Sequence, residues 1–192
     1  MNERAIRELA AWRKAGRPVP PPNSYKQWTV LTYGRRHRLR RFIETGTYRG
    51  DMVQAVHGQF EQVISIELGH ELFEAARARF AACPNVTLLE RDSTENLPEI
   101  LATLEEPALF WLDAHYSWGV TARGTKHTPI LEEVSHILTH PVQNHVILVD
   151  DVRLFGREAG YPLLERVKAL VREHCPRSSM AARHDILRIQ LA

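Results

Sequence analysis

The chain has 192 residues, of which 44% are hydrophobic, 8% aromatic and 25% charged. This composition is that of one compact domain with an apolar core, and it excludes disordered, low-complexity and collagen-like chains. The two cysteines form neither a disulfide framework nor a zinc pattern, and no apolar run reaches the roughly 18 residues of a membrane span. The charged N-terminal stretch lacks the apolar core of a signal peptide. We therefore expect a cytoplasmic protein with no membrane partner.

The formal net charge of +2 hides an uneven distribution. Residues 1–42 carry nine arginines and two lysines against two glutamates, and the most basic stretch spans 35–41. Such a stretch can attract an anionic partner such as nucleic acid. No aromatic–basic alternation or nucleic-acid motif accompanies it, so we interpret it as a solvent-exposed helix end and expect no nucleic-acid partner.

Residues 1–38 are predicted to form a helical segment with a proline-rich linker. Apolar residues recur at helical spacing over 3–15, and the run 18–22 ends that helix in an extended linker. Ser24 and Gln27 have the spacing of a capping box, which predicts the start of a second helix. Trp12 and Trp28 on these helices would dock either on the main domain or on a partner chain, as in a homodimer.

Residues 39–192 alternate apolar strands with helices. Strands are predicted at 42–44, 63–67, 86–89, 108–112, 146–149 and 186–189, and helices at about 51–60, 72–80, 97–104 and 163–174. Pro98 is expected in the first turn of its helix. The alternation indicates an α/β fold, Rossmann-like and doubly wound, with a mostly parallel sheet and helices on both faces.

An acidic residue lies at or just beyond the end of each of the first five strands. These residues are Glu44, Glu67, Asp92, Asp113, Asp150 and Asp151. Ligands of such sheets bind beyond the carboxyl ends of the strands, near the topological switch point. A structural protein does not need an acid at every strand end, so the pattern predicts a ligand site along this edge.

The turn after the first strand reads E-T-G-T-Y-R-G over residues 44–50. Gly46 and Gly50 allow a sharp turn and close approach of the backbone to a ligand. Their spacing differs from the G-x-G-x-x-G of pyrophosphate binding, and the Glu44 carboxylate suits an amino or sulfonium group instead. Glu67 can accept both hydroxyls of a ribose, and the pair 92–93 can face an adenine amino group. Each pattern alone is also compatible with a structural turn or a surface acid.

Asp113, Asp150 and Asp151 are expected to converge, because the fourth and fifth strands are predicted to be neighbours. Converging carboxylates need a cation, a basic neighbour or a proton, and oxygen ligands favour Mg²⁺ or a similar ion. The alternative is that Asp150 or Asp151 caps a loop and pairs with Arg153. His115 is the candidate general base, and the loop over 116–128 is typical of a substrate lid.

Together these residues resemble the class I S-adenosylmethionine-dependent methyltransferases, whose first motif reads E-x-G-x-x-x-G. They are most similar to the cation-dependent O-methyltransferases of the catechol and macrolide-sugar types. The resemblance implies about seven strands, with 179–191 supplying the last two as an antiparallel pair around His184 and Asp185. It assigns cofactor binding to Glu44, Gly46, Thr47, Tyr48, Gly50, Glu67, Leu68, Asp92, Ser93 and Asp113. It also assigns a divalent cation such as Mg²⁺ to Asp113, Asp150 and Asp151, and catalysis to His115 and Asp113.

The activity implied by this resemblance is metal-assisted O-methylation of a hydroxyl group on a small molecule, such as a sugar, a phenol or a natural product. No Asn-Pro-Pro-Tyr signature is present, which favours a hydroxyl acceptor. Two alternatives stay open: a catalytically silent cofactor-binding sensor or scaffold that associates with nucleic acid through its basic segment, and a nicotinamide-dependent oxidoreductase. The glycine spacing and Glu44 argue against the oxidoreductase, and the acidic cluster favours the enzyme over the scaffold.

Overall fold

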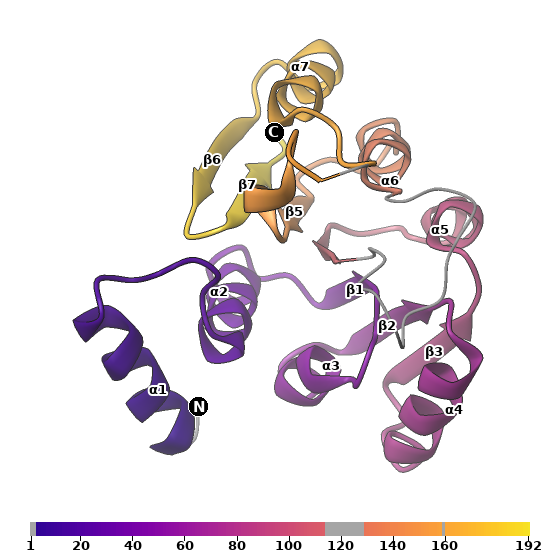
Figure 1. The fold of residues 1–192 in the computed structure, drawn as a ribbon. Coiled ribbons are helices and arrows are strands. Elements are labelled where there is room, and N and C mark those ends of the chain that lie inside the picture. The colour runs from indigo at the N-terminus through magenta and orange to yellow at the C-terminus, as the bar shows by residue number, and fades with distance from the viewer. Residues whose placement is uncertain (1–2, 114–128, 159) are drawn as a thin grey trace.

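The computed structural model describes residues 3–113, 129–158 and 160–192, which form a seven-stranded sheet with helices on both faces (Figure 1). The strand order is β3-β2-β1-β4-β5-β7-β6. The strands are β1 (Arg41–Thr45), β2 (Gln62–Glu67), β3 (Val86–Glu90), β4 (Ala108–Leu112), β5 (Val146–Val149), β6 (Ser179–Arg183) and β7 (Ile186–Gln190). The helices are α1 (Glu3–Lys14), α2 (Asn23–Arg36), α3 (Asp51–Val56), α4 (His70–Arg79), α5 (Ser93–Ala102), α6 (Ile130–Leu138) and α7 (Leu164–His174).

The first five strands run parallel, and β7 runs antiparallel to both of its neighbours. His184 and Asp185 form the turn between β6 and β7, with φ angles of 48° and 67°. Positive φ at both central residues is what a tight two-residue hairpin turn of type I′ requires. The predicted Rossmann-like sheet, with an antiparallel pair at its C-terminal end, is therefore confirmed.

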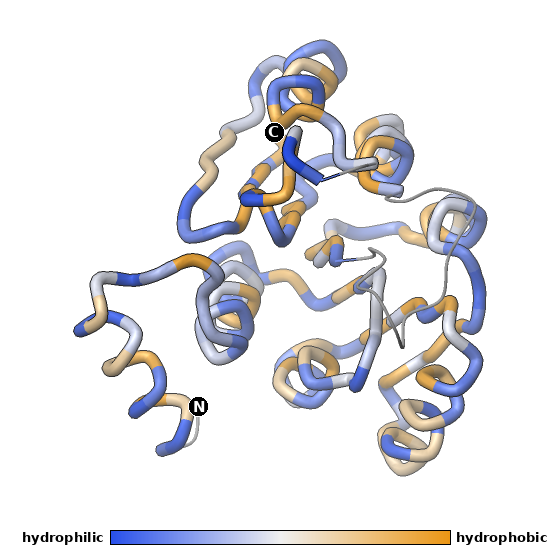
Figure 2. Tube along the Cα trace, viewed as in Figure 1, coloured by the Kyte–Doolittle hydropathy of each residue, from blue (hydrophilic) through white to orange (hydrophobic). Residues whose placement is uncertain are grey.

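The sheet divides the apolar core into two layers. Successive residues of a strand point to opposite faces. Ile43 and Phe110 accordingly pack with α5, α6 and α7, whereas Phe42 and Trp111 pack with α1, α2 and α3. Figure 2 shows hydrophobic residues in the sheet and a mixture of hydrophobic and hydrophilic residues along each helix. Within the described ranges, no helix combines the length and the hydrophobicity that crossing a membrane requires.

The two N-terminal helices pack on this chain's own sheet. The Trp12 ring is buried against Tyr25, at 4.6 Å between ring centroids, and against His184 of the β6–β7 turn. Arg188 of β7 donates a hydrogen bond to the Tyr25 hydroxyl at 3.2 Å. Of the two docking sites expected for Trp12, the structure shows the one on its own domain.

Three local predictions are corrected. The second helix begins at Asn23 with Pro22 as its N-cap, and the Ser24 hydroxyl finds no hydrogen-bond partner, so the capping box does not form. The helix expected from residue 97 starts at Ser93, because the Asp92 side chain accepts a hydrogen bond from Thr94 N–H; Pro98 consequently lies inside the helix. Helix α6 was not predicted from the sequence, although Pro129 and the acids Glu132 and Glu133 in its first turn are typical of a helix start.

Candidate active site

The strand ends bring the predicted acids to one edge of the sheet. Thr45 at the end of β1 pairs with Leu112 at the end of β4. The ladder continues beyond the strands, since Asp113 N–H donates to the Thr45 carbonyl and Asp150 N–H donates to the Leu112 carbonyl, each at 3.1 Å. Asp113 and Asp150 are therefore placed at the same edge as Glu44, as the strand pattern predicted.

The glycine turn after β1 has the backbone that its sequence predicted. Gly46 and Gly50 have φ angles of 87° and 73°, and Tyr48 between them also lies in the left-handed region, at 49°. A Cβ atom on Gly50 would stand 2.6 Å from the Phe80 ring, so a larger residue does not fit there. The turn is fixed to β2, because the N–H groups of Gly46 and Thr47 both donate to the Ile66 carbonyl.

Glu44 lies beneath this turn and is 1% exposed. Its Oε2 accepts a hydrogen bond of 2.6 Å from the Ser65 hydroxyl, which is itself 2.6 Å from the Thr47 hydroxyl. Burial raises the pKa of Glu44 well above its ordinary value, against the opposing effect of the Ser65 hydrogen bond, and nearby Asp113 and Glu67 raise it further. A buried carboxyl group in this setting is stabilised either by a proton or by a positively charged ligand group.

Glu67 joins the glycine turn to the start of α4. Its Oε2 accepts from Tyr48 N–H at 2.7 Å, and its Oε1 accepts from Gly69 N–H at 2.8 Å, so that Leu68 lies between Glu67 and the second donor in the sequence. A carboxylate has about four lone-pair sites, so both oxygens can still accept from a ligand. The backbone therefore orients Glu67 as a bidentate acceptor, which is the geometry that binding two ribose hydroxyls requires.

Asp92 and Ser93 mark the same edge at the start of α5. Asp92 Oδ1 accepts from both the N–H and the hydroxyl of Thr94, at 2.9 and 2.8 Å. Asp92 thus has a structural role as the helix cap, in addition to the adenine-facing position assigned to it from the sequence. Ser93 follows it and is buried.

The aspartates expected to bind metal form a different group from the one predicted. Among the described residues, Asp150, Asp151 and Asp185 have ligand oxygens within 4.8 Å of one another, and Asp113 is not part of this group. Arg153 donates from its guanidinium to both Asp151 and Asp185. The alternative prediction, an ion pair between Arg153 and one of these aspartates, is therefore observed. Asp185 also belongs to the group, although the sequence did not indicate it.

A lysine from the N-terminal segment lies against the same carboxylates. Lys26 Nζ forms an ion pair with Asp150 Oδ2 and stands 3.8 Å from Asp151 Oδ1. A divalent cation bound to Asp150 Oδ2 would lie about 2.0–2.6 Å from that oxygen, in the place that the ammonium group occupies. As folded, the cluster is compensated by Lys26 and Arg153, and its residues do not fit a resident metal ion.

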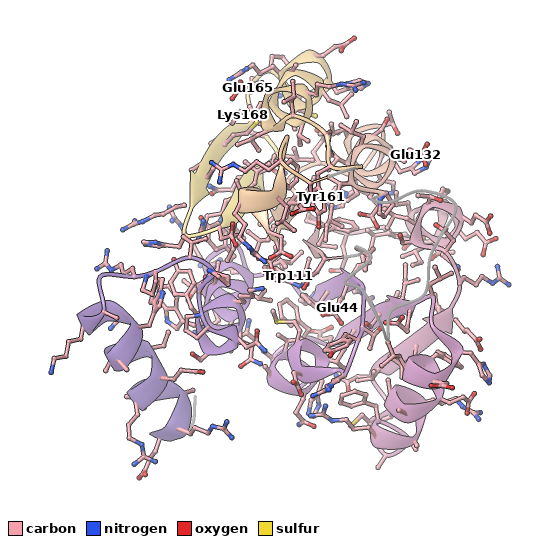
Figure 3. All side chains as sticks on the ribbon, in the orientation of Figure 1. Glu44, Trp111, Glu132, Tyr161, Glu165 and Lys168 are labelled. Carbon is pink, nitrogen blue, oxygen red and sulfur yellow. The ribbon has the colours of Figure 1, made fainter. Side chains whose placement is uncertain are left out.

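The charges around Asp150 are unevenly balanced. Burial and the nearby Asp113 raise the pKa of Asp150 above its ordinary value, and the Lys26 ammonium group opposes this rise. Tyr161, labelled in Figure 3, lies near the same acids, and burial together with Asp151 and Asp113 raises the pKa of its phenol. The part of the edge around Asp150 is therefore a buried, acidic region that contains the cations Lys26 and Arg153.

Glu133 on α6 is a further buried acid that the sequence analysis missed. Its side chain is 0% exposed on a helix face that also carries Ile130 and Val134, and an acid within such an apolar stripe is the signal that indicates it. Burial raises the pKa of Glu133 to about 7, and the nearby Ser93 and Thr45 oppose the rise. Glu133 therefore lies near the end of β1 and the start of α5.

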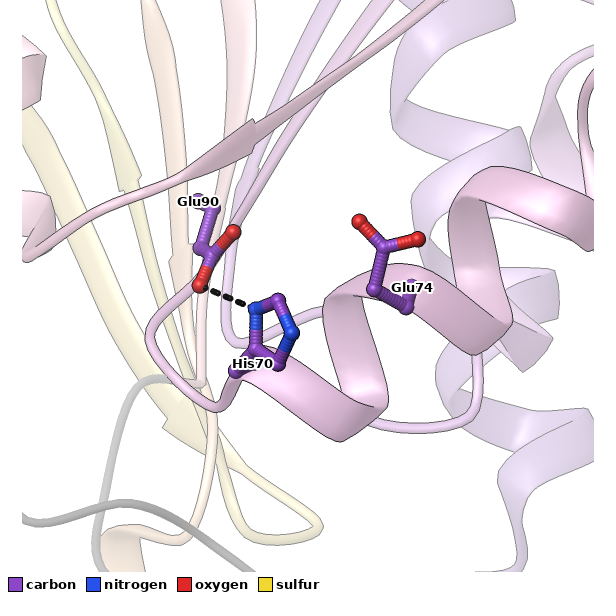
Figure 4. Close-up of side chains that lie close together, drawn as sticks. All are labelled: His70, Glu74 and Glu90. Carbon is purple, nitrogen blue, oxygen red and sulfur yellow. Dashed lines mark hydrogen bonds and ion pairs between the residues drawn. The ribbon is translucent and has the colours of Figure 1, made fainter.

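A second group of possible metal ligands lies on the surface. Figure 4 shows His70 at the start of α4 pointing toward Glu90 at the end of β3, with Glu74 one turn along the helix. His70 Nδ1 is 2.8 Å from Glu90 Oε1, and this contact raises the pKa of the imidazole. The histidine and Glu90 are exposed, so this group is separate from the buried aspartates.

The predicted base and lid cannot be placed in this arrangement. His115 and the loop over 116–128 lie outside the described residues, which omit 114–128. Their roles stay predictions from the sequence.

Solved structures of methyltransferases superpose on the whole of this chain. An O-methyltransferase from Bacillus cereus in complex with S-adenosylhomocysteine is 13% identical, with a TM-score of 0.67 over 100% of this chain and 92% of that chain. TomG, an O-methyltransferase from Streptomyces achromogenes in complex with S-adenosylmethionine, is 18% identical, with a TM-score of 0.62 over 100% and 90%. The S-adenosylhomocysteine-bound methyltransferase PaMTH1 from Podospora anserina is 17% identical, with a TM-score of 0.65 over 100% and 89%.

The chain has the class I methyltransferase fold. No protein-family model matches the sequence, and a search of curated proteins finds no significant match. Within the methyltransferase fold, the carboxyl ends of β1, β2 and β3 carry the glycine turn, Glu67 and Asp92, the residues assigned to the cofactor from the sequence.

The raised pKa of Glu133 predicts a pH-dependent stability. Between about pH 4.5 and 7 the unfolded chain loses this proton while the folded chain keeps it, so the free energy of unfolding falls as the pH rises through this window. The loss reaches about 3 kcal/mol for a group shifted to about 7. Glu133→Gln should remove this part of the pH dependence in urea unfolding curves recorded from pH 4.5 to 8.

The matched control is the same substitution at the neighbouring Glu132, which is only half-buried. Glu132→Gln should leave the pH dependence close to that of the wild type. Parallel pH profiles for the wild type and Glu133→Gln would contradict the assignment of a buried, protonated Glu133.

Proposed function

We propose that this protein is an S-adenosylmethionine-dependent O-methyltransferase that acts on a hydroxyl group of a small molecule, such as a sugar, a phenol or a natural product. The observation that carries the proposal is the glycine turn of residues 44–50 lying between the buried Glu44 and the backbone-oriented Glu67. The B. cereus enzyme and TomG, which share the fold, bind the cofactor or its product.

Each part of the cofactor has a matching group at this edge. Glu44 offers a buried negative charge to the cationic amino or sulfonium group, and Glu67 offers two oriented oxygens to the ribose. Asp92 and Ser93 lie where the adenine would reach the start of α5. When bound, the cofactor supplies an electrophilic methyl group attached to sulfur.

The protein has two tasks in the transfer. It must hold the acceptor oxygen about 3 Å from the methyl carbon, in line with the bond that breaks, and it must remove the hydroxyl proton. Asp113, half-buried at the end of β4, lies on the acceptor side of Glu44. His115, two residues further on, is the proposed base. No step is assigned to Mg²⁺, because Lys26 and Arg153 already compensate the aspartates.

Cofactor binding is tested by calorimetry with S-adenosylhomocysteine. Glu67→Ala removes the acceptors for two hydroxyl groups and should weaken binding by about 1–3 kcal/mol, or roughly 5–150-fold. Glu61→Ala is the matched control, since Glu61 is exposed just before the start of β2, at the opposite end from Glu67, and should bind as the wild type does. Binding of NAD by a protein that ignores S-adenosylhomocysteine would contradict the proposal.

The base is tested by single-turnover transfer of a labelled methyl group to a panel of catechol and sugar acceptors. His115→Ala should lower the transfer rate about 10²–10⁴-fold, the usual contribution of a general base, while the affinity for S-adenosylhomocysteine stays unchanged. His174→Ala, at the exposed end of α7, should transfer at the wild-type rate. A near-normal rate in His115→Ala would exclude this histidine as the base.

A further inference from the structure

The N-terminal segment delivers a lysine into the buried acidic cluster. The Lys26 side chain is 15% exposed, and the Asp150 side chain that it contacts is 0% exposed. Because water has little access to this pair, its charges are poorly screened and interact more strongly than a surface ion pair does.

The neighbours of Lys26 are the three aspartates that the sequence analysis assigned to a divalent cation. The Lys26 ammonium group forms its ion pair with Asp150 and lies 3.8 Å from Asp151 Oδ1, so it is surrounded by negative charge. It faces the same carboxylates that were expected to hold a metal.

The position of Lys26 is fixed by the residues on either side of it in α2. Tyr25 is buried and accepts a hydrogen bond from Arg188 of β7. Gln27 donates from Nε2 to the Asp51 carbonyl at 3.0 Å, at the start of the helix that follows the glycine turn. These contacts hold the first turn of α2 against β7 and the start of α3, and from there the Lys26 side chain reaches Asp150.

We propose that Lys26 takes the place of a divalent cation in this site: its ammonium group supplies the positive charge beside the acceptor hydroxyl, and the aspartate cluster holds no metal. An ammonium group has three N–H donors, and the ion pair with Asp150 uses one of them, which leaves donors for an acceptor oxygen. The role of Lys26 beside the acceptor hydroxyl rests on the proposed function. The claim that the aspartate cluster holds no metal ion does not depend on that function.

In the transfer step, an oxygen lone pair forms the new bond to the methyl carbon while the carbon–sulfur bond breaks and its electron pair returns to sulfur. The hydroxyl proton passes to a general base. Lys26 is already protonated and takes no proton. It donates a hydrogen bond to the oxygen whose negative charge increases as the proton leaves, the role in which a metal ion would otherwise act.

The metal part is tested on the full chain by electron paramagnetic resonance with MnCl₂ alone. Any Mn²⁺ that the wild type binds, for instance at His70, Glu74 and Glu90, should be unaffected by Asp150→Asn. Lys26→Ala leaves Asp150 without its cation and should bind additional Mn²⁺, which the double variant Lys26→Ala/Asp150→Asn should lose. Mn²⁺ binding by the wild type that Asp150→Asn abolishes would overturn the proposal, as would a folded Lys26→Ala that binds no additional Mn²⁺.

The acceptor part is tested by methyl transfer in excess chelator. Lys26→Met should lower kcat about 10²–10³-fold, the effect of removing one donor to a developing oxyanion. It should keep the affinity for S-adenosylhomocysteine, and Lys26→Arg should recover part of the rate. Lys168→Met is the matched control, because Lys168 pairs with Glu165 on the outer side of α7 (Figure 3). Wild-type turnover that the chelator abolishes, or full turnover in Lys26→Met, would overturn this role.

The two proposals fail in different ways. If the wild type does not bind S-adenosylhomocysteine, the proposed function fails, and the Mn²⁺ measurement still decides whether the cluster excludes a metal. If S-adenosylhomocysteine binds and the wild type also binds Mn²⁺ through Asp150, only the role of Lys26 fails.

Discussion

Parallel strands in register end at one edge of their sheet, and in this protein that edge concentrates negative charge. Each buried carboxylate there needs a proton, a hydrogen-bond donor or a cation. Glu44 accepts from Ser65, and Glu67 accepts from two backbone N–H groups. The aspartates beyond β5 are compensated by Lys26 and Arg153. Whether a proton, a hydrogen-bond donor or a cation stabilises an acid decides which ligand groups can bind next to it.

The two halves of the edge are built differently. Around β1 and β2, main-chain N–H groups orient Glu67 and the Ser65 hydroxyl orients Glu44, so the geometry follows from short stretches of sequence around residues 44–50 and 65–67. Around Asp150, side chains from α2, from the segment after β5 and from the β6–β7 turn meet in one ion-pair cluster. Removing one partner of such a buried pair leaves an uncompensated charge, which typically costs about 3–5 kcal/mol. The N-terminal helices are therefore part of the site as well as a cover for the sheet.

The arrangement of the edge around β1, β2 and β3 could be predicted from the sequence, because its signals are local. The acid-and-glycine turn, the acid ending β2 and the pair after β3 each lie within a few residues of a recognisable strand. Lys26 and Asp185 could not be predicted in this way, since they reach Asp150 from segments far away in the chain and only the tertiary structure shows the contact. Glu133 left a weaker signal, an acid on the apolar face of a helix that was not itself predicted. The capping box predicted at Ser24 does not form, although Ser24 and Gln27 have the right spacing. The helix begins at Asn23 with Pro22 as its N-cap, so Ser24 lies inside the helix.

The central claim is that one edge of the sheet holds a methyl-donor cofactor beside an acidic cluster that Lys26, and no metal, neutralises. A crystal structure of the wild type grown with S-adenosylhomocysteine and MnCl₂, with data collected at the manganese absorption edge, tests it most directly. We expect the ribose against Glu67, the Lys26 ammonium group against Asp150, and no anomalous peak among Asp113, Asp150 and Asp151. A manganese peak between these aspartates with Lys26 displaced, or a cofactor bound away from the 44–50 turn, would contradict the account.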